Sequence, residues 1–157
     1  MTDFAHGAVA EHDFEEREHR ELAPGINRIH DVALAVGTLA APDLCFAMLD
    51  VVDWIDGVLV PHATWEETWL YPEFERRAGT PWATRMMIYE HHQIREVARR
   101  VVNGRERIRV EPTRAEMVAL RADLLALEAL LRAHVEREER FLVPLLVDEA
   151  RVEVEVV

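Results

Sequence analysis

Residues 113–147 read TRAEMVALRADLLALEALLRAHVEREERFLVPLLV, and they carry the clearest periodic pattern in the chain. Apolar side chains recur there at alternating intervals of three and four residues, as they do in a helix that buries one face. The positions on that face are Met117, Leu120, Leu124, Leu127, Leu131, His134, Glu138, Phe141 and Leu145. Thr113 and Glu116 have the spacing of a capping box at the helix start. The pattern predicts a long helix over about 113–147, packed in an antiparallel bundle.

The rest of the chain divides into segments of helical composition at prolines and glycines. The breaks lie at Pro24-Gly25, at Pro42, at Gly79-Thr80-Pro81, and from Asn103-Gly104 to Pro112. The segments between them predict helices at about 26–41, 43–77 and 81–102. We expect residues 1–25 to form an N-terminal arm with room for a short helix, and residues 148–157 to form a short C-terminal tail. The sequence therefore predicts an all-α, up-down-up-down antiparallel four-helix bundle over residues 26–147.

A histidine and a glutamate interrupt the apolar face of the last helix, and the same pair occurs in the helix at 43–77. Residues 62–72 read HATWEETWLYP, and residues 134–144 read HVEREERFLVP. In both stretches His, Glu-Glu, Leu and Pro hold the same places. Burying such polar groups costs several kcal/mol unless they are paired or bind a metal. The repeat therefore indicates two helical hairpins that place polar groups inside one bundle.

The other two helices each contribute one histidine at a core position. With a rise of about 1.5 Å per residue and alternating helix directions, four histidines can meet at one height in the bundle. The His-x3-Glu spacing adds a carboxylate one turn along the same face in two of the helices. The candidate metal ligands are His30, His62, Glu66, His91, His134 and Glu138. Two carboxylates can bridge a pair of metal ions, and mixed imidazole and carboxylate ligands suit iron or manganese better than structural zinc.

The composition excludes several other chemistries. The chain has 157 residues, a formal net charge of −12, a single cysteine at Cys45, and neither lysine nor serine. A Ser-His-Asp triad, a lysine Schiff base and a thiolate zinc site are therefore excluded. The acidic excess argues against nucleic acid as a partner, and the short, charge-broken apolar stretches argue against a membrane span or a signal peptide. We expect a cytoplasmic protein that binds neither nucleic acid nor membrane.

These motifs resemble those of the hemerythrin-like, HHE cation-binding domains. The residues that carry the resemblance are His30, His62 with Glu66 and Glu67, Glu90 with His91, and His134 with Glu138 and Glu139. The resemblance covers about residues 26–147 and implies a four-helix bundle that holds a non-haem di-iron centre. The implied assignments are Glu66 and Glu138 as bridges, His30 and His62 on one iron, and His91 and His134 on the other.

Two differences from the oxygen-carrying hemerythrins bear on the expected function. The carriers have a second histidine in the third helix, where this chain has Arg95. In the last helix the carriers have an aspartate one residue further from the histidine than Glu138 is in this chain. Coordination is then more open, which disfavours reversible oxygen carriage. We expect a di-iron protein that binds or senses O2, peroxide or nitric oxide, with peroxide consumption as one activity. The alternatives are an iron-binding regulatory or storage module without turnover, and a metal-free helical interaction protein.

Several other segments are open to two interpretations. Glu67 and Glu139 either support the ligands or face solvent and pair with arginines. The bulky neighbours are expected in the core, with a shaped ligand pocket as the alternative; they are Trp65, Trp69, Ile94, Phe141 and Leu142. The alternating segments 107–110 (RIRV) and 151–157 (RVEVEVV) would match as strands from two copies of the chain. A frayed terminus is the simpler interpretation of the tail, and a homodimer is the alternative.

Overall fold

The computed structural model describes residues 4–108 and 112–144, with side chains from His19 onward. The first helix is α1 (Phe4–Ala35). The second runs without a break through α2 (Ala41–Trp54), η1 (Ile55–Leu59), α3 (Val60–Trp65), η2 (Glu66–Leu70) and α4 (Tyr71–Ala78), where η marks a π-helical turn. The third is α5 (Arg85–Arg107), and the fourth joins α6 (Arg114–Arg137) to η3 (Glu138–Leu142). All regular structure in these described residues is helical.

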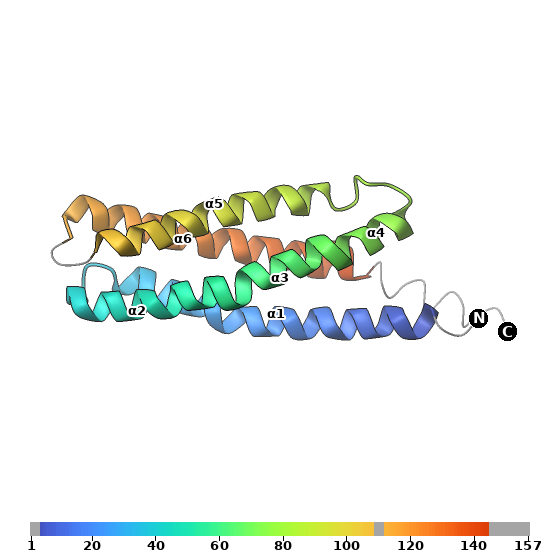
Figure 1. The fold of residues 1–157 in the computed structure, drawn as a ribbon, viewed down its shortest axis with the longest axis horizontal. Helices are drawn as coiled ribbons and strands as arrows, with labels where there is room; N and C mark the ends of the chain where they lie inside the picture. The colour runs from blue at the N-terminus through green and yellow to red at the C-terminus, as the bar shows by residue number, and fades with distance from the viewer. Residues whose placement is uncertain (1–3, 109–111, 145–157) are drawn as a thin grey trace.

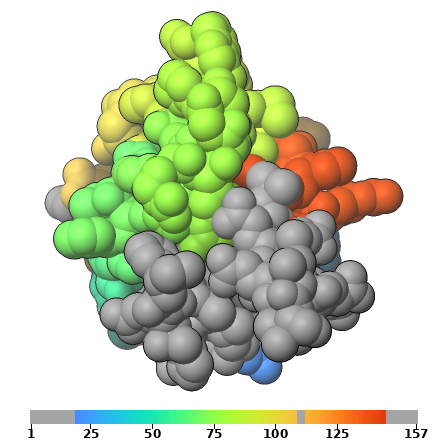
Figure 2. Space-filling model, turned by 90° about the vertical axis from the view of Figure 1, so that its right-hand side faces the viewer, coloured from blue at the N-terminus to red at the C-terminus, as the bar shows by residue number. Residues whose placement is uncertain are grey.

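Over the described residues, four helices alternate in direction along one bundle (Figure 1). Helix α1 packs against α2 and α6, and α5 packs against α6 and α2. The predicted antiparallel four-helix bundle is therefore confirmed. The α1–α2 turn and the α5–α6 connection lie at one end, and the α4–α5 connection lies at the other. Figure 2 views this second end, where the α4–α5 connection projects and Trp82 is 69% exposed.

Two apolar clusters of described residues lie on either side of a layer of polar side chains. The larger cluster takes side chains from all four helices, including Ile29, Met48 and Leu127. The smaller cluster lies on the other side of the polar layer and includes Phe74 and Met87. Between the two clusters, the buried polar side chains are histidines and glutamates. The clusters separate the polar layer from bulk water, so charge–charge interactions within it are strengthened.

Helix α1 differs from the sequence prediction, which placed a break at Pro24-Gly25 and an arm before it. The helix instead runs through Pro24 without interruption. The buried residues Leu22, Ile26 and Ile29 keep the three- and four-residue spacing on both sides of the proline. Pro24 cannot donate a backbone hydrogen bond, but burial of this apolar face stabilises the helix across that position.

Gly25 of α1 lies directly against the side chain of Trp54 in α2. A Cβ atom at this position would overlap the indole ring of Trp54. We expect Gly25→Ala to lower the free energy of unfolding by about 1–3 kcal/mol, because the partly buried indole, which packs against the core, must move. Urea unfolding measures the change, and Gly57→Ala is the matched control, since a Cβ there has no neighbour within 4 Å. Equal stability of the two variants would contradict the close approach.

Each π-helical turn in the described residues stands directly before a residue–proline pair, namely Val60-Pro61, Tyr71-Pro72 and Val143-Pro144. In each case the residue before the proline donates its N–H to the carbonyl five residues earlier. A proline ring crowds the carbonyl four residues before it, and a wider turn relieves that crowding while the helix continues. Two of these turns begin at Glu66 and Glu138, so the repeated sequence gives both glutamates the same local geometry.

The π-helical turns also change which side chains face the core. Spacing for a regular α-helix predicts Trp69 and Phe141 on the buried face, but these side chains are 68% and 61% exposed. A π-helical turn contains more residues than an α-helical one, so Leu70 and Leu142 take the buried places one position later. The prediction of core packing is therefore wrong for Trp69 and Phe141, and it is confirmed for Ile94 and Leu142.

The remaining sequence expectations have mixed outcomes. The capping box formed by Thr113 and Glu116 is present at the start of α6. Cys45 is partly buried, and its thiol donates to the carbonyl of Ile108. The proposed strand pairing involves residues 109–110 and 151–157, which lie outside the described residues. Within the described part of the chain, no helix is both long enough and apolar enough to cross a membrane.

Candidate metal centre

Six buried polar side chains meet in one layer of the bundle, and we call this set the polar layer. Each of the four helices contributes at least one member. Two of the members are the glutamates that begin the π-helical turns η2 and η3. The members are His19, His62, Glu66, His91, His134 and Glu138. None of the six is more than 5% exposed.

Among the described residues, the polar layer contains two groups that could hold a cation. The first group is His19, His62, Glu66 and Glu138, and the second is Glu66, His91, His134 and Glu138. Within each group, one ligand atom from every residue lies within 4.8 Å of the others. Both glutamates belong to both groups. Shared carboxylates of this kind are what a dinuclear metal site in a helical bundle requires.

The carboxylate of Glu66 spans the two groups. Its Oε1 lies 2.8 Å from Nε2 of His62, and its Oε2 lies 3.1 Å from Nε2 of His91. The carboxylate of Glu138 spans them in a different way, because a single oxygen lies between the groups. Its Oε2 is 3.3 Å from Nε2 of His19 and 3.4 Å from Nε2 of His134. Each carboxylate can therefore bind to ions in both groups.

The donor atoms of the polar layer fit a cation better than they fit one another. Both ring nitrogens of His19, both oxygens of Glu66 and Oε2 of Glu138 form no hydrogen bond of acceptable geometry with any described residue. The Nε2 atoms of His91 and His134 face each other at 2.9 Å. A buried polar atom without a hydrogen bond costs about 1–3 kcal/mol, so several in one layer need a common partner. Metal ions would satisfy the nitrogens and the carboxylates together.

In the metal-free polar layer, the buried histidines and glutamates shift one another's pKa values. Burial acts to lower the pKa of His19, but the carboxylates of Glu138 and Glu66 outweigh it and raise this pKa to about 10. Burial acts to raise the pKa of Glu66, but the imidazoles close to its carboxylate, His19 first, outweigh burial and hold that pKa well below its ordinary value. A proton on His19 thus offsets the charge of the buried carboxylates, and a bound cation would replace that proton.

Glu67 supports His91 from behind. Its Oε1 lies 2.8 Å from Nδ1 of His91 and also accepts a hydrogen bond of 2.7 Å from Arg95. Glu67 thus takes both of the roles suggested by the sequence, since it supports a candidate ligand and pairs with an arginine. A carboxylate on the outer nitrogen fixes the ring orientation and leaves Nε2 directed into the polar layer.

Glu90 supports His134 in the same way. Its Oε2 lies 3.0 Å from Nδ1 of His134, and its Oε1 lies 2.7 Å from Arg137. Sequence reasoning gave Glu90 no such role, because the contact joins residues 44 positions apart. Tyr71 adds a further polar contact, since its buried hydroxyl donates to the carboxylate of Glu138.

The structure brings five of the six sequence-predicted ligands together, but it does not bring His30 to them. His30 lies on the side of α1, where its partly exposed ring contacts Glu128 with 2.9 Å between Nδ1 and Oε2. His19 occupies the expected place, three helical turns earlier. The signal was present in the sequence, because continuing the buried spacing of α1 back through Leu22 leads to His19.

Helix lengths explain why His19 is at the right height. His19 lies 16 residues before Ala35 at the end of α1, and His91 lies 16 residues before Arg107 at the end of α5. These two helices run in the same direction, so equal distances from their ends place the two histidines level. His30 is only five residues from the end of α1 and lies well beyond the layer.

A family model for the hemerythrin HHE cation-binding domain matches residues 11–146. That match covers most of the chain, including every member of the polar layer. The chain belongs to the hemerythrin HHE cation-binding family. Neither a curated protein nor a solved structure matches it. In this hemerythrin HHE domain the match begins before His19, so it includes the part of α1 that precedes Pro24.

The comparison and the geometry agree on the kind of site. A cation-binding family and two overlapping His/Glu groups are together consistent with a dinuclear metal centre in this hemerythrin HHE domain. Each group offers two imidazoles of its own and shares two carboxylates with the other group. The third helix places Arg95 one turn after His91, and this arginine contacts Glu67 instead of supplying a further imidazole.

Proposed function

We propose that this hemerythrin HHE domain holds two iron ions in the polar layer and uses them to bind and consume hydrogen peroxide. The observation that carries the proposal is the sharing of two buried carboxylates between two histidine pairs. Imidazole and carboxylate donors without thiolate suit iron, and manganese is the second choice for the same donor set. Iron in such a site supplies redox and Lewis-acid chemistry.

The protein side chains have distinct tasks in this proposal. His19 and His62 would hold one ion, His91 and His134 would hold the other, and the shared carboxylates would bind both. Two imidazoles and two shared carboxylates leave coordination positions for a small ligand, as other histidine–carboxylate iron sites do. The apolar clusters on either side exclude bulk water, and the Tyr71 hydroxyl holds a proton at the Glu138 carboxylate.

Metal content is the first test of the proposal. Protein produced in iron-supplemented medium is expected to contain about two irons per chain, one for each His/Glu group. Its absorption spectrum should show the bands of an oxygen-bridged iron pair. A folded protein that contains no iron or manganese would contradict the metal proposal and favour the metal-free interaction protein.

Peroxide consumption without an added reductant is the second test. In disproportionation, one peroxide molecule is oxidised to O2 while another is reduced to water, so evolved oxygen measures turnover. We expect evolution of O2 by the iron-loaded protein and none by the metal-free protein. Two bound irons without evolved oxygen would contradict the catalytic part, and would favour a regulatory or storage module.

A further inference from the structure

The two His/Glu groups of the polar layer contain the same number and kind of donors. Each group has two imidazoles of its own, and both groups share the carboxylates of Glu66 and Glu138. The donors alone therefore give no reason for one metal position to bind an ion more strongly than the other. A difference between the positions has to come from the side chains that lie behind the histidines and hold their rings.

His91 and His134 are each held from behind by a glutamate and an arginine, and we call these sets the two Arg–Glu–His triads. In both triads the arginine follows its histidine by three or four residues on the same helix, and the glutamate comes from the preceding helix. The polar contacts within the triads are 2.7–3.0 Å long. The triads are Arg95–Glu67–His91 and Arg137–Glu90–His134.

The support behind His19 is weaker. Glu139 faces Nδ1 of His19 at 3.5 Å, and the two form no hydrogen bond of acceptable geometry. The side chain of Glu139 is 59% exposed, whereas those of Glu67 and Glu90 are 29% and 10% exposed. Water screens an exposed carboxylate, and holding it in one place costs side-chain entropy. The ring of His19 is therefore held less firmly than the rings of the two triads.

A carboxylate behind an imidazole strengthens that imidazole as a metal donor. It accepts the proton on Nδ1, which leaves the lone pair on Nε2, and it makes the ring more basic. The arginine of each triad restricts the carboxylate through a charge-assisted contact. The Nε2 atoms of His91 and His134 already face each other at 2.9 Å. An ion that binds there loses little free energy in orienting the rings.

We propose that the Arg–Glu–His triads make the position of His91 and His134 the stronger of the two metal positions, which fills first and loses its ion last. Arg95 and Arg137 are positioning residues in this proposal, because each reaches its histidine through a glutamate. The inference rests on the proposed function, since it assumes that the polar layer holds iron. It adds an order of binding that the proposed function does not contain.

The first test removes iron from the unaltered protein in steps. The iron-loaded protein is reduced in the absence of oxygen and titrated with a chelator that becomes coloured on binding Fe²⁺, so absorbance reports the iron removed. We expect one iron per chain to leave at low chelator concentration, and the second to leave at a concentration at least about tenfold higher. His19→Ala should hold only the iron that leaves at the higher concentration.

The second test weakens one triad at a time. Glu67→Gln keeps an oxygen that can accept from Nδ1 of His91 but removes the negative charge, and Arg137→Gln releases Glu90 from its arginine. We expect each variant to lose its second iron at a chelator concentration about tenfold lower, while the first step stays in place. Circular dichroism should show an unchanged helical bundle in both.

A conservative substitution separates positioning from a general structural role. Arg95→Lys keeps a positive charge beside Glu67, whereas Arg95→Gln removes it. We expect the second step of Arg95→Lys to lie closer to that of the unaltered protein than the second step of Arg95→Gln does. Equal shifts in the two variants would contradict the positioning role of Arg95.

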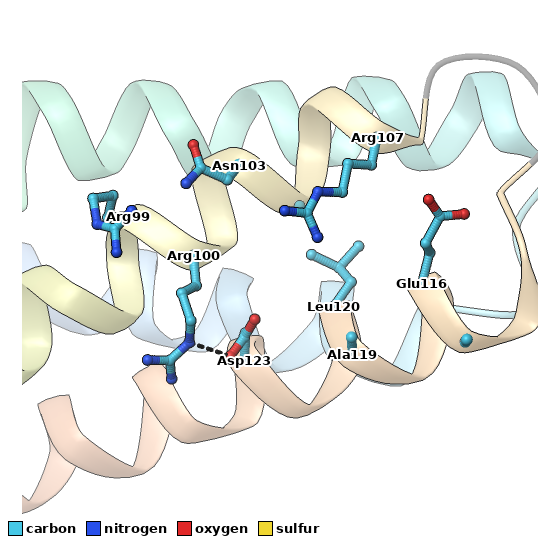
Figure 3. A pocket seen from close by; sticks show the side chains of 10 residues that line it. Arg99, Arg100, Asn103, Arg107, Glu116, Ala119, Leu120 and Asp123 are labelled. Atoms are coloured by element: carbon cyan, nitrogen blue, oxygen red, sulfur yellow. Dashed lines mark hydrogen bonds and ion pairs between the residues drawn. The ribbon is translucent and has the colours of Figure 1, made fainter.

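A matched control comes from another ion pair on the same helix, in a pocket of about 470 Å³ between α5 and α6 (Figure 3). Arg100 of α5 donates to Asp123 of α6 there, over 2.8 Å. None of the residues lining this pocket belongs to the polar layer. Arg100→Gln therefore removes an arginine from an ion pair of the same kind, and it should leave both steps of iron loss unchanged.

The outcomes separate this inference from the proposed function. Two steps of iron loss support the inference if the second step shifts in Glu67→Gln and Arg137→Gln but not in Arg100→Gln. Loss of both irons in one step, or a second step that stays in place in both triad variants, would overturn it although the proposed function stands. Unaltered protein that contains no iron would overturn both.

Discussion

Replacement of Glu138 by alanine is expected to remove both iron ions. The reason is geometric, because Oε2 of Glu138 lies 3.3 Å from His19 on one side and 3.4 Å from His134 on the other. Loss of this carboxylate takes a donor from each group at once and removes a negative charge that offsets both cations. Removing a residue that merely supports a ligand weakens metal binding about 10–100-fold, so loss of a shared ligand should exceed that range.

The Glu138→Ala experiment has three measurements. Iron content per chain should fall to near zero, evolution of O2 from peroxide should fall to the level of the metal-free protein, and circular dichroism should still show a helical bundle. Glu136→Ala, an exposed glutamate half a turn away, is the control and should retain both irons. Retention of one iron by Glu138→Ala would show that the carboxylate serves a single group.

Much of this centre follows from local sequence because the decisive signals are short-range. In each copy of the His-x-x-x-Glu-Glu repeat, the histidine and the first glutamate lie on one face of their helix: His62 with Glu66, and His134 with Glu138. This placement depends only on the spacing within the helix. Apolar residues on both sides of each pair indicate burial. The bundle and most of the ligands therefore depend on spacing within single helices.

The parts that sequence reasoning missed depend on contacts between helices or on unusual helix geometry. A proline usually marks a helix boundary. In α1, however, the apolar face continues through Pro24, which stabilises the helix and brings His19 into the polar layer. The π-helical turns shift the spacing by one residue, which exposes Trp69 and Phe141. The contact between Glu90 and His134 joins two helices, and no periodicity within either helix reveals it.

His19→Ala and His30→Ala are expected to differ sharply, and the pair tests the register of α1. His19 is a member of one His/Glu group, so its loss should leave the other group intact and reduce iron from about two to about one per chain. His30 contacts Glu128 at the partly exposed surface of the bundle. His30→Ala should keep both irons and lower the free energy of unfolding by no more than about 1 kcal/mol.

Ligand binding separates the two variants further. The iron that remains in His19→Ala is expected to be the one bound by His91 and His134. Nitric oxide should then bind to one iron per chain in His19→Ala, and to as many irons per chain in His30→Ala as in the original protein. Loss of iron from His30→Ala but not from His19→Ala would place His30 in the polar layer, and it would require α1 to lie about three turns further along the bundle than the structure has it.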